Sequence, residues 1–285
     1  MHISAKTDKR IQYKPAMQLT VSYDTEKYIR NVVKLNSKPE NYNITELDKV
    51  SADENLKLFD ILTSKMTDTI LKAEHLTKTF ISGKKTLTAV DDVSFELKQG
   101  ECLGIVGESG SGKSTIAKML THLESITDGK VILKGKDITN IKGKELRKIY
   151  RDIQMVFQMP MESFDPRCTL GDGIGESLRN MGISRTETRK KVEELLERCG
   201  LEKEYADRYP HQVSGGQCQR AAIARALAVN PEILICDEAT SALDVTVQKQ
   251  ILELLKELKE KEELSFLFIC HDLALVQEFC DKVLV

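Results

Sequence analysis

A lysine and a serine stand near the end of a short run of glycines and serines, GESGSGKST at residues 107–115. The run fits the spacing G-x-x-x-x-G-K-[ST] at every fixed position. Its glycines let the backbone turn tightly and aim N–H groups at an anion, while Lys113 adds a full positive charge. The Ser114 hydroxyl is a hard oxygen ligand suited to Mg²⁺. Together these groups fit the phosphates of a nucleoside triphosphate. The predicted binding set is Gly107, Glu108, Ser109, Gly110, Ser111, Gly112, Lys113, Ser114 and Thr115.

Three more polar side chains directly follow apolar segments. Ile233–Cys236 leads into Asp237 and Glu238, and Phe266–Cys270 leads into His271. Carboxylates at the end of a buried strand are costly unless they have a task. We expect Asp237 to reach Mg²⁺, directly or through water, and Glu238 to polarise the attacking water. A lone histidine is usually structural, but ligands of such sheets bind at the carboxyl ends of the strands. That position favours a γ-phosphate contact for His271.

A second glycine-opened helix is predicted at VSGGQ, residues 213–217. Ser214, Gly215 and Gly216 precede an alanine-rich helical pattern, so free backbone N–H groups there offer another anion site. This pattern by itself does not identify the anion. Phe80 is an aromatic residue upstream of the glycine run, and two interpretations stay open for it. It either stacks on a purine or packs in the core.

The elements that must position these side chains are short apolar strands and amphipathic helices. Cys102–Val106 is the predicted strand before the glycine run, and a helix follows it. Ile153–Phe157 is a predicted strand that ends at Gln158, and the long, turn-rich loop after it indicates function. The other predicted elements are strands at Ile70–Ala73, Leu87–Val90, Val93–Leu97 and Lys130–Leu133, a short basic helix at Lys144–Tyr150, a helix opened by a capping box of Ser184 and Glu187 and ended by Gly200, and a helix that buries Ile251, Leu254, Leu255 and Leu258.

Length and composition bound the class of protein. The chain has 285 residues, of which 41% are hydrophobic and 30% charged, as in a soluble globular protein. Its net charge of −2 gives no global basic field, so no nucleic-acid partner is predicted. No apolar run approaches the roughly 18 residues of a membrane span, and the N-terminus lacks the apolar core of a signal peptide. The seven cysteines contain no C-x-x-C pair, which is typical of reduced thiols in the cytosol.

The set of motifs, in this order, resembles the nucleotide-binding subunit of an ABC transporter. GESGSGKST resembles the Walker A loop, VSGGQ the signature, with Gln217 as its last residue, and ILICDE the Walker B strand. By the same resemblance Gln158 is the Q-loop glutamine, Asp244 belongs to the D-loop SALD, and His271 is the switch histidine. Phe80 matches the adenine-stacking position. SFDPRCTLGD and SALDVTVQKQILELL are similar to strings of the oligopeptide, dipeptide and nickel importer subfamily.

The resemblance implies a RecA-like P-loop α/β core with a parallel sheet, an antiparallel β subdomain and an inserted α-helical subdomain at about residues 160–230. It covers residues 69–285 and leaves residues 1–68 as an extension of unknown role. Because the chain stops at Val285 inside an expected strand, we expect a domain truncated at its C-terminus.

The implied activity is ATP hydrolysis that energises uptake of peptides, nickel or a related small solute, with ATP and Mg²⁺ as cofactors. Ser114, Gln158 and Asp237 would form the metal site, and Glu238, His271 and Gln158 the catalytic set. Two cassettes, of the same or a related chain, would face head to tail, each ATP lying between one P-loop and the other chain's Ser214, Gly215, Gly216, Gln217 and Asp244. Two membrane permease subunits and an extracytoplasmic solute-binding protein would complete the assembly.

Such a subunit would be peripheral, at the cytoplasmic face of the cell membrane. Two alternatives stay open: the ATPase of a non-transport complex such as one for phosphonate degradation, and a nucleotide-binding module without turnover.

Overall fold

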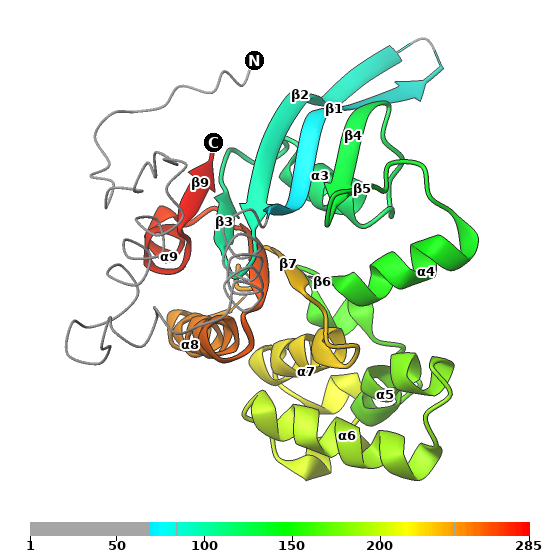
Figure 1. Ribbon diagram of the computed structural model, residues 1–285. Coiled ribbons are helices and arrows are strands. Elements are labelled where there is room, and N and C mark those ends of the chain that lie inside the picture. Colours follow the sequence, from blue (N-terminus) through cyan, green and yellow to red (C-terminus); the bar gives the residue numbers. More distant parts are fainter. Residues whose placement is uncertain (1–68, 84, 242) are drawn as a thin grey trace, which may run out of the picture. The chain divides into compact units, whose positions relative to one another are not determined.

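The computed structural model describes residues 69–83, 85–241 and 243–285, which contain a parallel and an antiparallel β-sheet together with helices (Figure 1). The prediction of an extension at residues 1–68 lies outside the described residues.

The parallel sheet has the strand order β6–β7–β8–β3–β9. Its strands β3, β7 and β8 are buried along their whole length, as the apolar runs in the sequence predict. Because all five strands run in one direction, their carboxyl ends meet at one edge. The bounds are β3 (Cys102–Ile105), β6 (Ile153–Val156), β7 (Ile233–Asp237), β8 (Ser265–Ile269) and β9 (Lys282–Leu284).

The antiparallel sheet has the order β2–β1–β4–β5. Its strands are β1 (Thr69–Ser82), β2 (Lys85–Lys98), β4 (Asp128–Leu133) and β5 (Lys136–Asp137). The strands predicted at Leu87–Val90 and Val93–Leu97 are one strand, β2, and β1 extends well beyond Ala73. The pairing continues through irregular registers, where His75 and Asp92 each have a φ of 52° and their side chains are 2.7 Å apart. These bulges break the period-2 pattern, which is why the sequence indicated shorter strands.

Seven helices are described, and three of them lie between β6 and β7 in the sequence. Those three, α5, α6 and α7, are grouped together in Figure 1, and two short 3₁₀ turns lie between α6 and α7. This is the inserted helical part expected from the resemblance. The bounds are α3 (Lys113–Leu120), α4 (Gly143–Asp152), α5 (Leu170–Asn180), α6 (Arg185–Arg198), α7 (Gly215–Leu227), α8 (Val245–Glu262) and α9 (Leu273–Phe279), with 3₁₀ turns η2 (Pro160–Ser163), η3 (Lys203–Asp207) and η4 (Pro210–Gln212).

Helix caps agree with the sequence only in part. At α6 the Ser184 hydroxyl accepts a hydrogen bond from the Glu187 N–H, but the return bond of a capping box is not formed. The Glu187 carboxylate instead lies 3.6 Å from Lys191, one turn further along the helix, so the predicted capping box at this helix is wrong. A complete box stands at α7, where Ser214 and Gln217 cap one another. Gly200, with a φ of 71°, follows the end of α6 as predicted.

The parallel sheet separates two hydrophobic cores. Along β7, Leu234 and Cys236 belong to the core that includes α7 and α8, whereas Ile233 and Ile235 belong to the core shared with α3 and the antiparallel sheet. The predicted apolar face of α8 (Ile251, Leu254, Leu255 and Leu258) is buried in the first core. The sheet is thus held on both faces, and its carboxyl edge is fixed in place.

A candidate nucleotide-binding site

The glycine run turns between β3 and α3 and forms one wall of a pocket of about 400 Å³. This pocket gathers side chains from the ends of three parallel strands and from the P-loop. Gln158 lies just after β6, Glu238 follows β7, and His271 follows β8. The described residues that line it are Ala89, Ser109, Gly110, Gly112, Lys113, Ser114, Thr115, Gln158, Glu238 and His271.

Gly112 is needed because another strand comes very close to the P-loop. It precedes α3 with a φ of 97°, in the left-handed region, and a Cβ placed there would lie 2.2 Å from the carbonyl oxygen of Ala89 on β2. The sequence did not indicate Ala89, because only its backbone takes part. The antiparallel sheet therefore supports the start of the phosphate-binding helix.

We expect Gly112→Ala to lower the melting temperature and to weaken nucleotide binding. Gly110→Ala is a matched control, because Gly110 also has a positive φ, of 80°, yet no atom lies within 4 Å of its would-be Cβ. Both variants carry the roughly 1–2 kcal/mol cost of a left-handed Cβ, and only Gly112→Ala adds the clash. Equal losses of stability in the two variants, measured by thermal melting, would contradict the clash with Ala89.

Lys113 is a buried cation whose partners are dipoles of the loop itself. Only 6% of the residue is exposed, and its Nζ donates to the carbonyl oxygens of Gly107 at 2.9 Å and Glu108 at 2.7 Å. The Ser111 hydroxyl lies 3.5 Å away. Among the described residues, Lys113 thus has neutral partners and no carboxylate counterion. A triphosphate entering this pocket would supply the missing negative charge.

Ser114 and Asp237 form an oxygen pair that fits Mg²⁺. The Ser114 hydroxyl donates to Asp237 Oδ1 at 2.8 Å, across the gap between α3 and the end of β7. Burial raises the pKa of the Asp237 carboxyl, and the hydrogen bond from Ser114 opposes that shift. The described residues contain no cluster of three or more His, Cys, Asp or Glu side chains that could hold a metal by themselves. Two oxygens are adequate for Mg²⁺, which usually keeps several waters and takes phosphate oxygens as further ligands.

Glu238 is held from both sides by the other two predicted catalytic residues. Gln158 Nε2 donates to Glu238 Oε2 at 2.7 Å, and His271 Nε2 contacts Glu238 Oε1. The second ring nitrogen of His271, Nδ1, is 3.4 Å from the Gly107 carbonyl oxygen. The Glu238 backbone has a φ of 50°, a left-handed conformation that costs energy in a non-glycine residue and is frequent at functional sites. The three side chains therefore form one network beside the P-loop.

The structure does not bring every predicted residue to this pocket. Phe80, 38% exposed on β1, is outside the lining, and the Lys78 ammonium lies 4.9 Å from the centre of its ring. Asp244 caps α8 by accepting a hydrogen bond from the Val247 N–H at 3.0 Å. The signature residues Ser214, Gly215, Gly216 and Gln217 open α7 and also stand outside the lining of the P-loop pocket.

The start of α7 is nevertheless held in place by a hydrogen bond and by close packing that the sequence did not indicate. Gln217 Nε2 donates to the Tyr205 hydroxyl at 2.7 Å. A Cβ at Gly216 would lie 2.5 Å from the Val247 side chain on α8. Further along α7, Arg225 stacks on Phe164 at 4.6 Å and donates to the Ser163 carbonyl. These contacts tie α7 to the loop that follows Gln158, and no local pattern predicts them.

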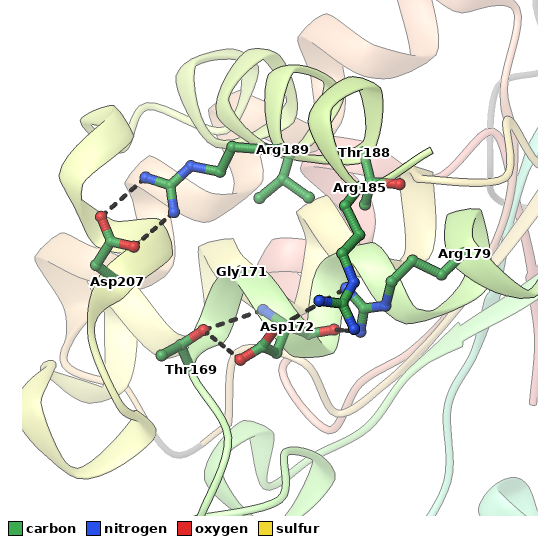
Figure 2. A pocket seen from close by; sticks show the side chains of 9 residues that line it. Thr169, Gly171, Asp172, Arg179, Arg185, Thr188, Arg189 and Asp207 are labelled. Carbon is green, nitrogen blue, oxygen red and sulfur yellow. Dashed lines mark hydrogen bonds and ion pairs between the residues drawn. The ribbon is translucent and has the colours of Figure 1, made fainter. Parts of the chain in front are cut away.

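A larger pocket, of about 530 Å³, lies over α5, α6 and η3 (Figure 2). It is lined by charged side chains, most of them paired with each other. Arg189 forms two hydrogen bonds with Asp207 and one with Glu193, and Arg179 donates to the Asp172 carbonyl. The lining contains no residue of the P-loop or of the Glu238 network. The triphosphate chemistry therefore belongs to the smaller pocket.

The fold and the pocket define a P-loop nucleotide-binding protein, and solved structures narrow the class to ATP-binding cassettes. A dimeric post-hydrolysis structure of the ATP-binding cassette MJ0796 bound to ADP and Pi matches with a TM-score of 0.69 at 35% identity, covering 75% of this chain and 92% of that one. The cbiO1 protein of Clostridium perfringens, part of the ABC transporter complex cbiONQ, matches with a TM-score of 0.67 at 30% identity, covering 76% and 84%.

Sequence comparison gives the family. Residues 90–241 match the family described as ABC transporter. The oligopeptide transport ATP-binding protein OppF of Bacillus subtilis is 47% identical over 221 residues, which cover 76% of this chain and 72% of the relative. OppF of Salmonella typhimurium is 49% identical over 203 residues, which cover 70% of this chain and 61% of that relative. The chain belongs to the ABC transporter family and to its ATPases. The resemblance and the fold class predicted from the sequence are confirmed.

Within the described residues, no helix has both the length and the apolar character needed to cross a bilayer.

Proposed function

We propose that the chain binds ATP with Mg²⁺, hydrolyses it, and energises peptide import through separate membrane subunits. The observation that carries the catalytic part is the meeting of Lys113, the Ser114–Asp237 pair and Glu238 at one edge of one sheet. The transport part is supported by the relatives, which are named oligopeptide transport ATP-binding proteins.

In this mechanism each polar group has a separate task. Lys113 would exchange loop carbonyls for phosphate oxygens, and Ser114 and Asp237 would hold Mg²⁺ at the end of β7. Bound there, Mg²⁺ would supply positive charge that offsets the negative charge of the triphosphate. Glu238 accepts a hydrogen bond from the attacking water and takes its proton. Each carboxylate oxygen has two lone pairs, so Glu238 can accept this bond while Gln158 and His271 hold it in place.

A second cassette would complete each ATP site. Helix α7 opens with Ser214 at its N-cap, and its first N–H groups carry the positive end of the helix dipole. Because these residues do not line the P-loop pocket of their own chain, we place them, with Asp244, on the ATP held by a second copy or a related chain. The dimeric form of the MJ0796 cassette supports this arrangement. Two permease subunits and an extracytoplasmic solute-binding protein would complete an importer at the cytoplasmic face of the membrane.

Lys113→Ala should lower ATP affinity by about 10- to 150-fold, since a charge-assisted contact contributes about 1.5–3 kcal/mol. Calorimetric titration with ATP and Mg²⁺ measures the change. Lys118→Ala is the matched control, because Lys118 is an exposed lysine on the same helix and does not line the pocket. Unchanged ATP affinity in Lys113→Ala would refute the P-loop assignment.

The transport part has its own test. Purification from a mild detergent extract should recover two membrane permease subunits, and cells that carry only Lys113→Ala should lose uptake of labelled peptide. Recovery of soluble phosphonate-degrading enzymes in place of permeases would instead establish the non-transport alternative.

A further inference from the structure

Helix α4, the green helix between the antiparallel sheet and α5 in Figure 1, carries one strongly basic face. Lys144, Arg147, Lys148 and Arg151 follow the spacing i, i+3, i+4 and i+7, which places all four on the same side of a helix. All four are exposed. Ile149 is the buried residue of this helix and belongs to the core shared with α3 and the antiparallel sheet.

The acidic residues of α4 do not neutralise this face. Glu145 is paired with Lys136 on β5 at 3.1 Å, and Asp152 is paired with Lys134 at 3.3 Å. Within the part of the chain that the structure describes, none of the four cations on the basic face forms an ion pair. The carboxylates of α4 are thus paired with lysines outside the helix, whereas the four cations of its basic face are exposed to solvent.

This cluster of like charges lowers the stability of the isolated chain. Like charges three and four positions apart on a helix repel one another, and the face contains four such neighbouring pairs. The concentration is local, because the whole chain has a net charge of −2. A flat, anionic partner would convert the repulsion into attraction.

We propose that the basic face of α4 binds the anionic headgroups of a lipid bilayer. The proposal rests on the proposed function to the extent that membrane subunits bring the chain close to the cytoplasmic leaflet. Loops of membrane proteins on that side are themselves enriched in Lys and Arg, so the leaflet complements this face better than such loops do. Nucleic acid fits less well, because four cations on one short helix form no groove with aromatic stacking platforms.

The test compares two variants of equal net charge. In the first, the basic face is neutralised; in the control, four exposed lysines scattered over β2, β4, α6 and α8 are neutralised. The face variant carries Lys144→Gln, Arg147→Gln, Lys148→Gln and Arg151→Gln, and the control carries Lys85→Gln, Lys130→Gln, Lys190→Gln and Lys249→Gln. Cosedimentation is measured with vesicles of equal parts phosphatidylglycerol and phosphatidylcholine, and with phosphatidylcholine alone.

The unaltered chain should bind the mixed vesicles, and binding should fall as salt is raised. Each cation near an anionic surface contributes on the order of fivefold in affinity, so the face variant should lose on the order of a hundredfold or more. The control should keep most of the binding. Both variants should bind ATP as the unaltered chain does, and Lys113→Ala should still bind vesicles, which separates this proposal from the proposed function.

Three outcomes would overturn it: no difference between the two vesicle types, an equal loss in the control, or binding to a single-stranded oligonucleotide without binding to vesicles.

Discussion

Glu238→Gln should reduce ATP turnover by about 10²–10⁴-fold while leaving ATP binding nearly intact. The amide keeps the size of the carboxylate, and its oxygen can still accept the hydrogen bond from Gln158. It cannot accept a proton from the attacking water. Lys113 and the Ser114–Asp237 pair, which would hold the triphosphate and Mg²⁺, are unchanged. Binding without turnover should trap ATP and keep a dimer closed.

Single-turnover hydrolysis and size-exclusion chromatography with ATP measure these two effects. Glu232→Gln is the matched control, because Glu232 precedes the opposite end of the same strand and its carboxylate is 45% exposed. If Glu238→Gln hydrolyses ATP at nearly the normal rate, another group must serve as the base.

The sequence was sufficient for those parts of the site whose chemistry is local. Lys113 and Ser114 follow directly on glycines, so the sequence itself indicates both the tight turn and the positive charge, and the structure places both residues in the pocket that Glu238 also lines. Asp237 and Glu238 could be placed because a parallel sheet brings the carboxyl ends of its strands to one edge. The γ-phosphate contact of His271 stays a prediction; in the structure its ring lies between Glu238 and the Gly107 carbonyl.

Features that depend on tertiary contacts could not be predicted from the sequence. Ala89 supports Gly112 through a backbone carbonyl, which no side-chain pattern records. The bulges at His75 and Asp92 interrupt the alternation of buried and exposed residues in β1 and β2, so the predicted strands were too short. At α6 the Glu187 side chain has two possible partners, Lys191 and the Ser184 N–H, and local sequence does not decide between them. Ser214 does not line the pocket, so the role proposed for it requires a second chain.

A mixture of two inactive variants should recover ATPase activity if each ATP is shared between two chains. Lys113→Ala removes the P-loop charge, and Ser214→Arg fills the start of α7. In a head-to-tail dimer that contains one of each, one site carries both defects and the other site carries neither. Mixing the unaltered chain with the Lys113→Ala/Ser214→Arg double variant instead leaves one defect in every site of the mixed dimer.

The first mixture should therefore be active, and mixed dimers isolated from the second should have almost no activity. Ser214→Arg also removes the hydroxyl that accepts the Gln217 N–H, a cap that contributes about 1 kcal/mol, so the fold of each variant must be checked by thermal melting. Activity must be measured on dimers separated by affinity tags, because unmixed dimers dilute the signal.

If each chain completed its own site, the order of the two activities would reverse. The unaltered chain in the second mixture would keep a sound site, whereas every site in the first would carry one defect. The ranking of the two mixtures thus decides whether Ser214 serves the ATP of its own chain or that of a partner.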